Sequence, residues 1–109
     1  MTKYLISFPS TGMQDIPEED MPAVGRAAHA VVQELRDAGV YVFTGGMEED
    51  EAPVTVAADG SVTGGTYPLG GMTIVDVSSR DNALGWAAKI AAACRCAQEV
   101  CAFQPDPLA

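Results

Sequence analysis

The only histidine of this 109-residue chain, His29, lies in the segment "GRAAHAVVQELRDAG", residues 25–39. A neutral imidazole exchanges a proton near pH 7, so this side chain suits general acid or base chemistry without a cofactor. A single histidine on a helix is also commonly a surface or interface residue. The sequence therefore offers one candidate for acid–base catalysis and, beside it, a simpler structural interpretation of the same residue.

Three cysteines, Cys94, Cys96 and Cys101, lie close together near the C-terminus. Their odd number argues against a disulfide framework. With His29 they could surround a zinc ion, but the paired C-x₂₋₄-C spacing of structural zinc sites is missing, so we expect small buried side chains and no metal. The sequence contains no G-x-S-x-G nucleophile motif, phosphate-binding loop or dinucleotide motif, and we expect no cofactor.

Fifteen acidic residues stand against six basic ones, for a formal net charge of −9. This charge repels phosphate backbones and anionic lipids, so we expect neither a nucleic acid nor a membrane surface as partner. No apolar run reaches the roughly 20 residues that cross a bilayer, and no leader-like start is visible, so we expect a cytoplasmic protein. We interpret the acidic run of residues 48–51 as a solvated loop, because it lacks the ligand spacing of a calcium loop.

Hydrophobic periodicity predicts a strand and then a helix in the first part of the chain. Residues 3–8 alternate as a strand with Tyr4, Ile6 and Phe8 on one face. Asp15 can cap a helix whose body begins between residues 16 and 22 and ends before Gly39. Its apolar stripe recurs at steps of three and four, at Met21, Val24, Ala28, Val31 and Leu35. His29 then lies at the edge of the stripe, about 120° from its centre.

Five further elements complete one domain that spans residues 1–109. They are a strand over 40–44, a hairpin over 54–65, a strand over 71–77, a helix within 78–93 and a strand over 99–103. Asp59-Gly60 suits the turn of the hairpin, where a positive φ is needed. Ser78 can cap the second helix. The packed side of this helix is predicted to comprise Ala83, Leu84, Ala87, Ala88 and Ala91.

This order of elements predicts an α+β fold, a ferredoxin-like βαββαβ arrangement with an inserted β-hairpin. Two helices would cover one face of a four-stranded antiparallel sheet. In a chain this short nothing remains to cover the other face, and a second copy is the simplest cover. We therefore expect a homodimer whose sheets face each other, a dimeric α-β barrel with a pocket between sheet and helices or between the sheets.

The chain resembles the YCII-related proteins, and among them the branch named for its DGPF motif. The resemblance covers nearly the whole chain and is most specific in "LGGMTIVDVSSRDNALGWAAKI", residues 69–90. It implies the same dimeric α-β barrel. The branch normally carries "TDGPFAETKE" before its "LGG", whereas this chain reads "TGGTYPLGG" at residues 63–71. The signature is thus degenerate, and only Gly65 and the Gly70-Gly71 pair carry over, as structural residues.

Many members of the wider YCII-related group carry R-x-x-H in the first helix, and "RAAH" from Arg26 to His29 fits this pattern. The resemblance implies an active-site histidine that works with an aspartate, and Asp37 in the same helix is one candidate. Arg26, Tyr4 and Tyr67 are candidate binding residues, since Tyr67 sits between two glycine pairs in a loop that could border a pocket. The aspartate stays open, with three alternatives: Asp15, Asp50 and Asp76.

These observations leave two main hypotheses for function. One is a cofactor-free enzyme in which His29 acts as a general acid or base on a small organic substrate in a dimer-associated pocket. The other is a non-catalytic module for small-molecule binding or dimerisation, which the loss of the DGPF signature favours. A purely structural role within an assembly is a third possibility.

Overall fold

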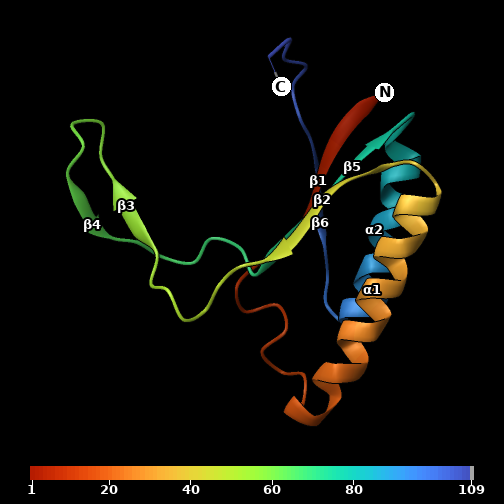
Figure 1. Cartoon of the computed structure of the whole chain (residues 1–109), viewed down its shortest axis with the longest axis horizontal. Coiled ribbons are helices and arrows are strands. Elements are labelled where there is room, and N and C mark those ends of the chain that lie inside the picture. Colours follow the sequence, from red (N-terminus) through yellow and green to blue (C-terminus); the bar gives the residue numbers. More distant parts are fainter. Residues whose placement is uncertain (109) are drawn as a thin grey trace.

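The computed structural model of the chain describes residues 1–108 and shows an α+β structure with two α-helices and six strands in antiparallel sheets. Figure 1 shows their arrangement. The elements are, in order, β1 (Thr2–Phe8), the short 3₁₀ helix η1 (Glu18–Asp20), α1 (Met21–Asp37), β2 (Tyr41–Gly46), β3 (Val54–Val56), β4 (Val62–Gly64), β5 (Gly71–Val77), α2 (Arg80–Cys94) and β6 (Glu99–Ala102).

Four strands form one antiparallel sheet in the order β2-β5-β1-β6, and both α-helices cover the same face of it (Figure 1). In the centre of the sheet Ile6 lies opposite Thr73 on one side and Val100 on the other. The sheet is open and does not close into a barrel within one chain. No helix in residues 1–108 has the length and apolar character that crossing a bilayer requires.

The core lies between the sheet and the helices. Ile6, Leu35, Val75 and Val77 are the largest side chains with less than 2% of their surface exposed. Because side chains alternate along a strand, burial of Val75 and Val77 against the helices turns Ile74 and Asp76 to the other side. We call that side the open face; it also carries Leu5, Val42, Phe43, Met72 and Cys101.

The predicted apolar stripe of the first helix is confirmed at Val24, Val31 and Leu35, which are buried. The predicted start of the helix body between residues 16 and 22 is confirmed, but Asp15 is not its cap, because the N-cap residue of α1 is Asp20. The first helical turn is η1, which begins after Pro17, and α1 then begins at Met21 with Pro22 in its first turn. Proline is tolerated there because the first N–H groups of a helix have no intrahelical partner.

The start of α2 lies one residue from the predicted position. Ser79, and not Ser78, is the N-cap: its backbone is extended and its Oγ accepts a hydrogen bond from the Asn82 amide at 3.1 Å. Ser78 Oγ instead accepts from the Asn82 side chain at 2.8 Å. Two adjacent serines fit the same capping pattern, so the pattern could not separate them.

The packed side of α2 also differs in part from the prediction. Ala83 and Ala87 are buried as expected, but they are joined by Ile90, while Leu84 is 41% exposed. Alanines occupy several sides of this helix, so the sequence pattern defines its buried face poorly.

The segment between β2 and β5, residues 47–70, forms an arm whose hairpin β3–β4 projects away from the sheet and both helices (Figure 1). Its predicted turn is confirmed: Gly60 has φ +88°. The Asp59 carboxylate accepts hydrogen bonds from the Ser61 amide at 2.9 Å and the Ser61 hydroxyl at 2.7 Å. The Ser61 side-chain and backbone hydrogen bonds lower the pKa of Asp59.

Candidate functional site

A cavity of about 380 Å³ lies between α1 and the sheet, and we call it the α1 cavity. Apolar side chains supply most of its wall, from the end of β1, from the buried side of α1 and from α2. Glycines of β2 and β5 leave further wall positions without a side chain. The polar residues that line it are His29, Thr44, Thr73, Cys94 and Gln98.

His29 borders this cavity although its side chain is exposed, which places it at the mouth. The position follows from the helix: Val24, Ala28 and Leu35 line the interior, and His29 lies one step around from Ala28. The edge of the apolar stripe, visible in the sequence, therefore corresponds to the rim of a real cavity.

None of the described residues that line the α1 cavity carries a carboxylate. Asp37 lies eight residues after His29, which is about 12 Å along a helix, and its carboxylate accepts a hydrogen bond from Gln33 Nε2 at 2.9 Å. Asp76 points to the open face, on the opposite side of the sheet from the cavity. Asp15 is exposed in the segment between β1 and η1, and Asp50 is exposed in the arm. The structure does not bring any of the four aspartates onto the cavity wall with His29.

The threonine pair on the cavity wall has a defined direction of hydrogen bonding. Thr44 Oγ1 donates to the Met72 carbonyl at 3.1 Å and lies 2.9 Å from Thr73 Oγ1. Because a hydroxyl has one proton, the Thr73 hydroxyl then donates to Thr44 and keeps lone pairs free. Gln98 Nε2 donates weakly to the Cys96 carbonyl at 3.4 Å, which leaves the Gln98 carbonyl oxygen as a second free acceptor. The wall thus offers acceptors and no fixed charge.

The thiols are poorly suited to act as nucleophiles. Burial raises the pKa of Cys94, and the neighbouring Cys96 raises it further. Burial likewise raises the pKa of Cys96. A thiol is nucleophilic only as the thiolate, so both side chains remain protonated and unreactive at neutral pH.

The three candidate binding residues lie outside the α1 cavity. Arg26 is exposed on α1 and does not line it. Tyr4 is 8% exposed and belongs to the core between sheet and helices. Tyr67 lies at the base of the arm, where its hydroxyl is within hydrogen-bond distance of the Glu49 and Glu51 carbonyls, at 3.1 and 3.2 Å. The structure gives Tyr4 a packing role and gives Tyr67 a role in bracing the arm.

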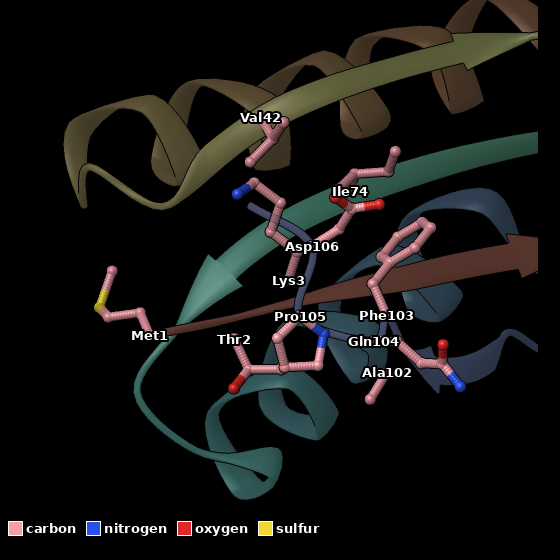
Figure 2. Close-up of a pocket in the computed structure, with 10 residues that line it drawn as sticks. All are labelled: Met1, Thr2, Lys3, Val42, Ile74, Ala102, Phe103, Gln104, Pro105 and Asp106. Atoms are coloured by element: carbon pink, nitrogen blue, oxygen red, sulfur yellow. The ribbon is translucent and has the colours of Figure 1, made fainter. Parts of the chain in front are cut away.

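A larger cavity of about 740 Å³ lies on the open face, and we call it the tail cavity (Figure 2). Lys3, Val42 and Ile74 border it from three strands, and Phe103 to Asp106 of the C-terminal tail border it from above the sheet. The tail continues the pairing of β6, since the Phe103 amide donates to the Lys3 carbonyl at 2.9 Å. This cavity could not be predicted from the sequence, because Pro105 and Pro107 indicate only that the last strand stops.

Asp76 lies beside the tail cavity as the cross-strand neighbour of Lys3. Its Oδ1 is shielded from solvent and has no hydrogen-bond partner among the described residues. A buried carboxylate oxygen without a donor is costly. The open face therefore contains a polar group that the single chain leaves unsatisfied.

No group of three or more histidine, cysteine, aspartate or glutamate side chains within residues 1–108 is placed to hold a metal ion. Comparison with known proteins adds nothing further: no family model and no curated protein matches this chain.

Proposed function

We propose that this protein is a homodimer that binds a small, neutral, mainly apolar organic molecule in the α1 cavity, without a cofactor. The observation that carries the proposal is the composition of the cavity wall: apolar side chains with hydrogen-bond acceptors at Thr73 and Gln98, a thiol at Cys94 that burial keeps protonated, and an imidazole at its edge. Ligand sites of proteins combine an apolar lining with few placed polar groups in this way, and 380 Å³ lies at the small end of their range.

The wall also indicates the chemistry of the ligand. No Lys or Arg lines the cavity among the described residues, and the chain carries a net charge of −9, so an anion would be repelled without compensation. A cation would be buried without a carboxylate beside it. A neutral molecule with a hydroxyl or amine donor satisfies the free acceptors, and His29 at the mouth can accept or donate one further bond.

The dimer is proposed from the open face. Val42 and Phe43 are 40% and 51% exposed there, beside Ile74. In a dimer whose sheets face each other these side chains would be covered, as in the ferredoxin-like dimeric α-β barrel of the YCII-related proteins that the chain resembles. The strand order β2-β5-β1-β6 is compatible with that arrangement.

The binding proposal is tested with a thermal-shift panel of phenol, indole and neutral aromatic amines. A ligand present at 100 times its Kd stabilises the native state by about 2.7 kcal/mol. Gly25 lines the cavity with open space at its Cβ position, so Gly25→Leu fills the site, whereas Gly85→Leu places the same side chain in open space on exposed α2. We expect shifts that disappear in Gly25→Leu and persist in Gly85→Leu. A panel whose shifts are equal in both variants, or absent from the native protein, would refute the proposal.

Acid–base catalysis by His29 is a second candidate, favoured by one observation: the only imidazole of the chain borders the cavity. The lack of a carboxylate on the wall removes the group that would orient and polarise the ring. A panel molecule that binds and is also converted by native protein, but not by His29→Ala, would favour the enzyme. Binding without conversion favours the binding module.

A further inference from the structure

The arm exposes three valines on one face of its hairpin. Val54, Val56 and Val62 are 62%, 63% and 60% exposed. Val56 lies opposite Val62 across the hairpin, and Val54 is two residues before Val56, so the three share one face. Thr55 and Thr63 lie opposite each other on the other face. The hairpin is therefore amphipathic, and within residues 1–108 its apolar side stays exposed, on an arm that projects away from the sheet and both helices (Figure 1).

An isolated two-stranded hairpin is at best marginally stable in water. This one has strands of only three residues. A hairpin of this size needs a surface to pack on, and the exposed valines identify the face that would meet it.

The base of the arm is nevertheless braced. Tyr67 Oη reaches the Glu49 and Glu51 carbonyls at 3.1 and 3.2 Å, and the Gly65 amide donates to the Pro53 carbonyl at 3.0 Å. A Cβ at Gly65 would lie 3.0 Å from the Val54 carbonyl carbon, so a larger residue would crowd this approach. These contacts join the two halves of the arm at its base.

The accessible surface area of the chain is larger than that of a compact monomer of the same mass. Its accessible area is 7313 Å², whereas a compact monomer of this size exposes about 5,700 Å². Its radius of gyration is 15.4 Å, against about 13 Å for a compact domain of this length. The excess area is about twice the roughly 800 Å² that each partner contributes to a standard interface. The accessible area of the single chain therefore fits a subunit that buries part of its surface against a partner.

The same chain carries an apolar surface that the valines could cover. A β-bulge in β2 sets both Val42 and Phe43 against Ile74 of β5, which concentrates three apolar side chains on the open face beside the tail cavity. This surface lies level with Leu5 at the middle of β1, whereas the arm leaves the sheet at the Phe8 end and points away from it (Figure 1). An arm cannot cover the patch of its own chain without folding back over the sheet.

We propose that two copies of the chain exchange arms, each laying its valine face on the partner's open face around the residues equivalent to Val42, Phe43 and Ile74. This inference rests on the homodimer of the proposed function and makes the partner's arm the cover of these residues at the β2 edge, while the central strands of the two sheets still face each other. A two-fold axis makes both contacts at once, because each chain supplies one arm and one patch. The patch residues carry no charge, so the contact avoids the repulsion between two chains of net charge −9.

The test compares dimer dissociation constants by sedimentation equilibrium. Val56→Asp places a carboxylate on the valine face, and Thr55→Asp places one on the opposite face of the same hairpin as a matched control. We expect Val56→Asp to weaken the dimer at least about 100-fold, because each dimer would bury two unpaired carboxylates, and Thr55→Asp to change it less than about threefold. Phe43→Asp is expected to weaken the dimer as well.

The possible results distinguish a failure of arm exchange from a failure of the proposed homodimer. A dimer that Phe43→Asp dissociates but Val56→Asp does not would overturn arm exchange and leave the sheet dimer standing. A monomeric native protein would overturn both, while ligand binding in the α1 cavity is decided independently by the thermal-shift panel. Hydrogen exchange of residues 54–64 provides a second readout should Val56→Asp fail to fold. Their amides should be protected in the native dimer and exchange faster after dilution below its dissociation constant; equal exchange would contradict the contact.

Discussion

Gly25 and Gly85 allow a direct test of the space beneath α1. Both lie inside α-helices, and a Cβ at either position meets nothing within 4 Å. Glycine in a helix interior is less favourable than alanine by about 0.5–1 kcal/mol, because its backbone loses more freedom on folding. Gly25→Ala and Gly85→Ala should therefore each raise the free energy of unfolding by about that amount. For a domain of this size the midpoint temperature should rise by about 2–4 °C.

The two substitutions differ in where the methyl group goes. At Gly25 it enters the α1 cavity, and at Gly85 it enters solvent. Urea denaturation followed by circular dichroism measures both changes, and the double variant should be additive to within about 0.5 kcal/mol because the sites share no partners. A loss of 1 kcal/mol or more in Gly25→Ala, with the expected gain in Gly85→Ala, would mean that the space beside α1 is filled, and the α1 cavity would not exist.

Three further substitutions have defined outcomes. Gly70→Ala should lower the unfolding free energy by about 1–3 kcal/mol in urea melts, because a Cβ there would lie 2.5 Å from the Phe8 ring; an unchanged midpoint would contradict the close approach. Burial raises the pKa of the Cys94 thiol. The stability that this shift contributes is present below the unfolded thiol pKa of about 8.5 and is lost as pH rises through the folded pKa, so Cys94→Ala should flatten this decline of the unfolding free energy; an unchanged decline would contradict the burial of the thiol. Ser79→Ala should cost about 1 kcal/mol and remove the α2 cap, whereas an equal or larger loss in Ser78→Ala would show that the capping residue is misassigned.

The helices, strands and turns of this fold could be predicted where a single local sequence signal decides the structure, such as side-chain alternation or a glycine at a turn. The alternation of residues 71–77 predicts β5 with its observed bounds, because every second side chain enters the core. Gly39 and Gly60 both have positive φ, as expected for a helix stop at Gly39 and a hairpin turn at Asp59-Gly60. The start of α1 was harder to predict, since Asp15, Pro17 and Pro22 all suit a helix start and tertiary contacts decide among them.

The candidate site was predicted less completely. The helical period places His29 at the edge of the buried stripe, and the structure places it at the rim of a cavity. The aspartate alternatives could have been narrowed further from sequence. Asp76 lies between two core valines and must point away from the helices, and Asp37 is more than two helical turns from His29. Tyr67 could not be placed, because its partners are main-chain carbonyls in a loop without periodicity.

The glycine pairs at residues 45–46 and 70–71 explain why the cavity itself could not be predicted. In the sequence they indicate only that strands end and that the arm begins. In the structure the Gly70 amide donates to the Phe8 carbonyl at 2.8 Å, and the Met47 amide donates to the Gly70 carbonyl at 2.9 Å, so the pairs join the arm to the sheet. Gly46 and Gly71 pair with each other on the α1 side of the sheet and line the cavity, where a larger residue would supply a side chain. The glycines that join the arm to the sheet therefore also leave space beneath α1. This space is a cavity only because α1 packs over those positions, which the sequence does not show.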